Sequence, residues 1–70
     1  MTHYAEFLGE SILTWIKLGI STRAEIELRV REFTGWKQDR AERMVGVVLR
    51  SLQRNGAIEL HPVHGWRIGK

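Results

Sequence analysis

The sequence predicts a mainly α-helical domain that ends in a small β-hairpin. Apolar residues recur at helical spacing in three successive segments, and the last of these stops at Asn55-Gly56. After that stop, apolar and polar residues alternate in two short runs that flank a turn-rich segment. A chain of 70 residues fits a single domain, residues 1–70, which is small for a deep catalytic pocket.

The composition is that of a folded, intracellular protein. Hydrophobic residues make up 43% of the chain and charged residues 27%, which is close to ordinary globular usage. Because there is no cysteine, we expect stability from packing alone and a cytoplasmic location. No apolar run approaches the roughly 20 residues that cross a bilayer, and no export signal is visible, so no membrane partner is expected. The net charge of +3 suits a nucleic-acid partner.

The first predicted helix covers residues 4–18. Residues spaced three and four apart form its apolar face: Tyr4, Phe7, Leu8, Ile12, Trp15 and Leu18. Leu13 falls on the polar side and Ile16 on one flank, so the apolar surface is wider than one small core needs. Two alternatives follow: the helix is clamped between other elements, or Leu13 and Ile16 form a homodimer interface. Gly19 is placed to end the helix as a left-handed cap.

The second predicted helix, residues 22–33, is the ambiguous segment. From Ala24 onward, apolar and charged residues alternate strictly, which is typical of a strand. Against this, Ile26, Val30 and Phe33 share one helical stripe, and the residues from Thr22 to Glu25 match a capping box. We therefore predict a helix and keep a strand as the alternative.

The third predicted helix covers residues 37–54 and follows a turn around Gly35. Its inward face is the strongest periodic pattern in the chain and consists of Ala41, Met44, Val45, Val48, Leu49 and Leu52. A β-hairpin at residues 57–68 completes the predicted fold. Its inward face is expected to carry Ile58, Leu60, Trp66 and Ile68.

Two segments, ISTRAEI at residues 20–26 and LRSLQRNGAI at residues 49–58, resemble the winged helix-turn-helix family of DNA-binding domains. The resemblance extends from Tyr4 to Ile68. It implies that helix 37–54 enters the major groove of double-stranded DNA while the hairpin touches the backbone or minor groove. It also implies a stand-alone transcription regulator or architectural factor, such as phages and mobile elements often encode. The family usually has a small residue where this chain has Arg31, which leaves the angle between the two helices open.

The candidate DNA-binding residues of helix 37–54 lie on its outward face and at its N-terminal end. They are Lys37, Gln38, Arg40, Arg43, Arg50 and Arg54. The resemblance places the first four, near the N-terminal end, at the bases, with Gln38 suited to adenine, and the last two at phosphates. The planar fork of arginine suits both guanine and phosphate oxygens. Because Asp39 and Glu42 dilute this stripe, an ordinary solvated face is the alternative.

Other elements offer further contacts. Arg23, beside Ser21 and Thr22, could bind a backbone phosphate where the second helix begins, or the segment could serve in capping alone. On the hairpin, His64 and Arg67 are candidates for the backbone or minor groove. His61 and His64 lack the further ligands that a metal site needs, so we expect no metal and no cofactor.

The remaining motifs concern stacking and catalysis. Trp15 and Trp66 are predicted in the core, whereas Trp36, beside the turn, could also stack on bases. We expect no enzyme activity because the chain has no cysteine nucleophile, no glycine-rich phosphate loop and no credible serine–histidine–acid set. The alternative function is a protein–protein interaction module, an adaptor or inhibitor that uses the first helix or the outward face of the third.

Overall fold

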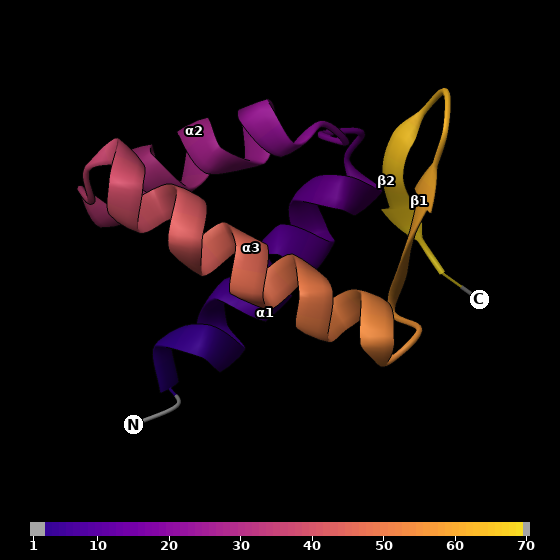
Figure 1. Ribbon diagram of the computed structural model, residues 1–70, viewed down its shortest axis with the longest axis horizontal. Coiled ribbons are helices and arrows are strands. Elements are labelled where there is room, and N and C mark those ends of the chain that lie inside the picture. Colours follow the sequence, from indigo (N-terminus) through magenta and orange to yellow (C-terminus); the bar gives the residue numbers. More distant parts are fainter. Residues whose placement is uncertain (1–2, 70) are drawn as a thin grey trace.

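The computed structural model describes residues 3–69, with side chains from Phe7 onward. Its elements, in chain order, are α1 (His3–Lys17), α2 (Arg23–Thr34), α3 (Gln38–Arg54), β1 (Ile58–His61) and β2 (Gly65–Ile68) (Figure 1). The predicted fold class is confirmed: three helices precede an antiparallel hairpin, the layout of a winged helix. The ambiguous second segment is a helix. Tyr4, predicted on an inward face, lies outside the residues whose side chains are described.

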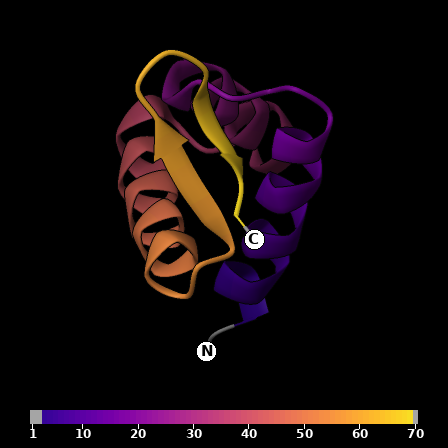
Figure 2. The same cartoon turned by 90° about the vertical axis from the view of Figure 1, so that its right-hand side faces the viewer.

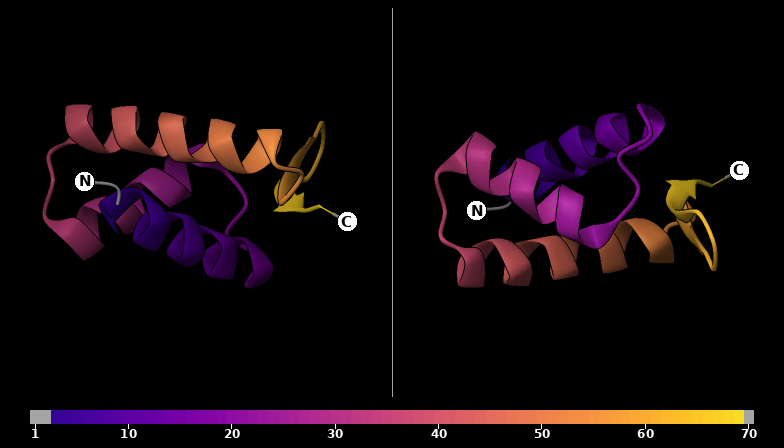
Figure 3. Two further views of the ribbon diagram at one scale, coloured as in Figure 1. Left: turned by 90° about the horizontal axis from the view of Figure 1, so that it is seen from below. Right: turned by 90° about the horizontal axis from the view of Figure 1, so that it is seen from above.

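The helices surround a single core that the hairpin closes at one end. Seen from that end, α3 and α1 lie on opposite sides, with α2 above them and the hairpin in front (Figure 2). β1 contacts α3 and β2 contacts α1, at the end of the molecule where both helices finish (Figure 3). The turn between α2 and α3 lies at the other end. The hairpin and the turn between α2 and α3 therefore lie at opposite ends of α3.

All three helices and the hairpin contribute to the core. Its buried members are Leu8, Ile12, Ile16, Ile26, Val30, Ala41, Val45, Val48, Leu49 and Ile58. Trp15 and Trp66 pack against this cluster as predicted, and so does Trp36. Each fully buried aliphatic side chain contributes roughly 1.5–3 kcal/mol relative to its exposed state, so this cluster is the main source of stability.

The orientation of α1 corrects two predictions. The inward stripe is Leu8, Ile12 and Ile16, spaced four apart, and Ile16 is only 5% exposed. A dimer interface built on Ile16 is therefore wrong, because that side chain belongs to the core of its own molecule. Leu18 lies beyond the end of α1 and is 74% exposed, so its predicted inward position is also wrong. Phe7 is half exposed at the edge of the stripe, and so is Phe33 of α2, which contacts the Phe7 ring and does not share the burial of Ile26 and Val30.

Capping interactions define α2. Thr22 is the N-cap, and its hydroxyl accepts a hydrogen bond from the Glu25 amide at 3.3 Å while donating to the Glu25 carboxylate at 3.0 Å. At the other end, Gly35 adopts φ 79°, and its amide donates to the carbonyl of Arg31. The left-handed cap predicted at Gly19 is also present, with φ 99°. These caps fix where the chain leaves one helix and enters the next.

The hairpin is held to the rest of the molecule both at its base and near its tip. Its register pairs Leu60 with Trp66, and the Trp66 amide donates to the carbonyl of Ser21 at 2.8 Å. The segment before α2 therefore binds the free edge of β2. Only Ile58 is fully buried, whereas Leu60 is 58% and Ile68 is 38% exposed, so their predicted inward positions are wrong. Each strand has four residues, and the side chains of the two strands that contact the core are Ile58 and Trp66.

Candidate nucleic-acid interface

A polar network fastens α2 to α3. The Gln38 side-chain amide donates to Glu27 Oε1 and Glu42 Oε2, both at 3.0 Å, and its oxygen accepts from Arg31 Nη1 at 3.2 Å. Arg31, which left the interhelical angle open in the sequence, is thus an exposed bridge between the two helices. Both ends of the Gln38 amide are therefore engaged, and this half-buried residue links α2 to α3.

Arg23 belongs to the same network. Its Nε donates to Glu27 Oε2 at 2.8 Å, and its Nη2 donates to the carbonyl of Glu42 at 3.0 Å. The guanidinium lies across Gly46, where an added Cβ would sit 2.9 Å from Nη2. Arg23 therefore spans from the start of α2 to the middle of α3. Sequence reasoning missed this contact, for which the glycine within a strongly periodic helix was the available signal.

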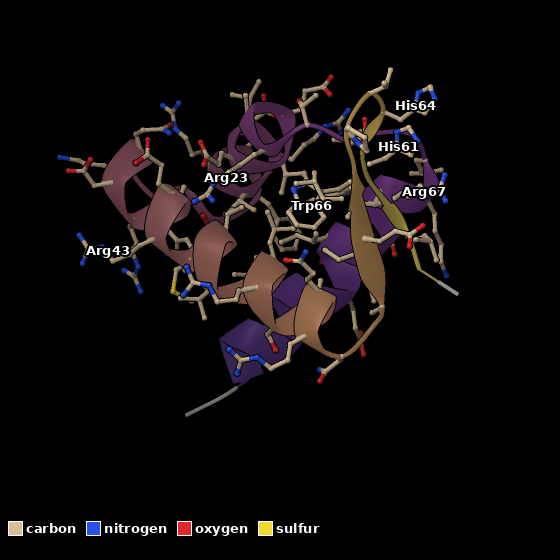
Figure 4. The ribbon with its side chains drawn as sticks, turned by 45° about the vertical axis from the view of Figure 1, so that its right-hand side comes forward. Arg23, Arg43, His61, His64, Trp66 and Arg67 are labelled. Atoms are coloured by element: carbon tan, nitrogen blue, oxygen red, sulfur yellow. The ribbon has the colours of Figure 1, made fainter. Side chains whose placement is uncertain are left out.

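The other predicted cations of α3 lie on its solvent side. Lys37, Arg40, Arg43, Arg50 and Arg54 are all exposed. Within the described part of the chain none of them forms an ion pair, since the two ion pairs there are Arg23–Glu27 and Arg67–Glu59. Arg43 projects away from the body of the molecule (Figure 4). The five side chains form the feature that we call the basic face.

One end of the basic face has a defined shape. The Arg40 guanidinium carbon lies 4.5 Å from the centroid of a Trp36 ring, and such a contact contributes roughly 0.5–1 kcal/mol at exposed sites. Both residues line an open hollow of about 610 Å³ together with Lys37, Arg43, Asp39, Met44 and Gly35. Trp36 therefore acts as a platform for Arg40, which restricts where that cation points.

The N-terminus of α3 adds to the positive potential of this end. Lys37 is the N-cap residue and makes no side-chain capping hydrogen bond. The first amides of a helix lack intrahelical acceptors, and the helix dipole places partial positive charge there. Asp39 in the first turn opposes this charge in part. The cations Lys37, Arg40 and Arg43 still outnumber it around the hollow.

The candidate DNA-binding residues of the hairpin differ in whether other residues already engage their side chains. Arg67 Nε donates to Glu59 Oε2 at 2.6 Å across the strands, so its charge is matched. His61 Nδ1 accepts from the amides of Val63 and His64, both at 3.1 Å, and so holds the tip. His64 is exposed, with its ring 4.7 Å from that of His61. These residues lie at the end of the molecule opposite Arg43 (Figure 4).

Two features are absent from the residues that the structure describes. No three His, Cys, Asp or Glu side chains there are grouped closely enough to hold a metal ion. None of the helices described is long and apolar enough to cross a membrane.

Comparisons with known proteins do not identify a relative. No family model, curated protein or solved structure matches the chain. A functional assignment therefore depends on the chemistry of the surface itself, and the basic face of α3 is its most distinctive part.

Proposed function

We propose that the protein binds double-stranded DNA by inserting α3 into the major groove, and that it acts as a transcription regulator or architectural factor without chemistry of its own. The observation that carries the proposal is the basic face, four exposed cations on α3 and a fifth at its N-cap, without ion-pair partners in the described residues. Phosphate contacts supply most of the affinity of such proteins, and unpaired arginines and lysines are the groups that make them.

The dimensions of α3 fit this role. The major groove is about 12 Å wide and admits a helix. The 17 residues of α3 span about 25 Å at 1.5 Å per residue, so the helix extends beyond the groove at one end or both. We assign Lys37, Arg40 and Arg43 to the bases and nearby phosphates, and Arg50 and Arg54 to phosphates farther along. His64 would reach the backbone from the hairpin.

The interhelical network sharpens the assignment. Arg23 and Gln38 already bind carboxylate or carbonyl oxygens of α2 and α3, so in this proposal they position the recognition helix and do not contact DNA. By holding Glu27, Arg23 also offsets an acidic charge that phosphate would otherwise meet. Arg67 takes a minor role because Glu59 compensates its charge. This function would place the protein in the cytoplasm, with the nucleoid.

The test is a fluorescence titration of a random-sequence duplex at several salt concentrations. We expect the affinity to fall steeply with salt, by a log–log slope of about 0.9 for each phosphate contacted. The double variant Arg40→Glu/Arg43→Glu should lose measurable binding. Its matched control, Lys17→Glu/Arg29→Glu, changes the net charge by the same amount on exposed positions of α1 and α2 and should bind far better.

Equal losses in both double variants would show that total charge, and not the basic face, drives binding. No binding by the unaltered protein at the lowest salt would contradict the proposal outright.

A protein-binding module is the second candidate, and one observation favours it. An open hollow of about 400 Å³ lies between α1 and α3, with a mainly aliphatic lining that includes Leu13, Val48 and Leu52. Apolar surface of this kind often marks association. A well-folded protein that ignores DNA at low salt would turn the assignment to this hollow, and Leu13→Glu should then abolish partner binding.

A further inference from the structure

Val47 is an apolar residue within the basic face. It lies one turn after Arg43 and one turn before Arg50, and its side chain is 54% exposed. All of α3 lies within the described residues, and Val47 is its one large apolar side chain that is exposed. Valine is also a weaker helix former than arginine, lysine or alanine. Neither the core nor helix propensity accounts for a valine at this position.

The surroundings of Val47 leave its outer surface free. It borders the hollow between α1 and α3 beside Val48, which is buried. More than half of the Val47 side chain nevertheless faces solvent, between two cations. If Arg43 and Arg50 contact DNA on either side of Val47, the base edges of the groove come to lie opposite Val47.

We propose that Val47 reads thymine by packing on its C5-methyl group, which makes it a specificity-determining residue. This inference rests on the proposed DNA-binding function. The C5-methyl of thymine is the apolar group that base pairs present in the major groove, where the other groups are hydrogen-bond donors and acceptors. Because valine is short, this contact requires α3 to lie close to the base edges, with the longer Arg43 and Arg50 reaching past it on either side.

The size of the effect follows from the group that is buried. Burial of one methyl group stabilises a complex about fourfold in affinity. Uracil lacks this methyl group and keeps the hydrogen-bonding groups of thymine. A deoxyuridine in place of the thymine that meets Val47 should therefore weaken binding about fourfold, and the same exchange elsewhere in the site should have little effect.

The experiment begins by selecting a duplex from a random pool with the unaltered protein. Each thymine of the selected duplex is then replaced singly by deoxyuridine, and affinities are measured for the unaltered protein, Val47→Ala and Leu28→Ala. We expect a loss of about fourfold at one thymine per bound α3, and equal binding of both duplexes by Val47→Ala. Leu28→Ala is the matched control, since Leu28 is 51% exposed on α2, and it should discriminate as the unaltered protein does.

Three results would overturn the inference: no thymine selected, no effect of deoxyuridine at any position, or discrimination that survives in Val47→Ala. If salt-sensitive binding still depends on Arg40 and Arg43, any of these results leaves the proposed function standing. Absence of all DNA binding would overturn both. Thermal unfolding of Val47→Ala checks that the variant is folded, which we expect because alanine is the better helix former.

Discussion

At the scale of single residues, Gly46 leaves space on α3 for the side chain of Arg23 from α2. Glycine within a helix costs about 1 kcal/mol relative to alanine. Here the space above Gly46 holds the Arg23 guanidinium, whose Nη2 donates to the carbonyl of Glu42. A hydrogen bond contributes a net stabilisation of roughly 0.5–1.5 kcal/mol, and an ion pair near the surface such as Arg23–Glu27 adds a similar or smaller amount. The cost of the glycine and the gain from the arginine are therefore of similar size.

We predict that Gly46→Ala changes stability differently with and without Arg23. In the unaltered protein the new methyl displaces the guanidinium, so the helix-propensity gain and the lost hydrogen bond cancel to within about 0.5 kcal/mol. In an Arg23→Ala background the same change should stabilise by about 1 kcal/mol. Urea unfolding of the four proteins in this cycle measures both effects. An equal effect of Gly46→Ala in the two backgrounds would show that Arg23 does not occupy this space in solution.

The residues of the candidate site were only partly predictable from the sequence. Exposure of Arg43, Arg50 and Arg54 followed from the period of α3 alone, since they lie opposite its apolar stripe. The engagement of Arg23 and Gln38 did not, because their partners lie on two helices whose crossing no single-helix pattern specifies. Periodicity predicts on which side of a helix a residue lies, but it does not predict which residues of other elements contact it there.

At the scale of elements, the capping residues predicted the structure of α2 better than the alternation of apolar and charged residues did. The strict alternation in α2 is typical of a strand, yet the Thr22 cap and the Gly35 stop enclose a helix. Local hydrogen bonds at both ends satisfy amide and carbonyl groups that the pattern of side chains does not address. In the hairpin, alternation identified the strands correctly but overstated how many apolar residues they bury, because burial depends on the reach of α1 and α3 beneath them.

The attachment of the hairpin gives a prediction about two glycines. Gly65 and Gly56 both have positive φ, 78° and 80°, so alanine is strained at either position. At Gly65 an added Cβ would also lie 2.6 Å from the carbonyl oxygen of Ser21, whereas at Gly56 nothing lies within 4 Å. We expect Gly56→Ala to cost about 1 kcal/mol and Gly65→Ala about 3 kcal/mol.

Thermal unfolding ranks these two variants, and hydrogen exchange locates the damage. The Trp66 amide, which donates to Ser21, should exchange faster in Gly65→Ala than in Gly56→Ala. Similar costs for both variants, with Trp66 equally protected, would argue that the hairpin is not held against the segment before α2.

At the scale of the whole molecule, a small core has to stabilise a surface that carries many charges. The described residues include ten buried hydrophobic side chains, and the chain has no cysteine to add a disulfide. Domains of this size have little stability in reserve, often near 5 kcal/mol. Concentrating cations on α3 adds self-repulsion, which phosphate binding would relieve. We infer that DNA should raise the unfolding temperature of a protein organised in this way.

The burial of Ile16 allows a test of whether this core belongs to one molecule or is shared between two. Ile16→Ala removes a side chain that is 5% exposed and should cost about 2–5 kcal/mol, most of the stability expected for the domain. The buried residues of one chain form this core together, which indicates that it is internal. The unfolding temperature of the unaltered protein should then not depend on protein concentration. Leu13→Ala, at the rim of the hollow between α1 and α3, should lower the free energy of unfolding much less. A midpoint that rises with concentration and falls to a constant value in Leu13→Ala would instead identify that rim as a dimer interface.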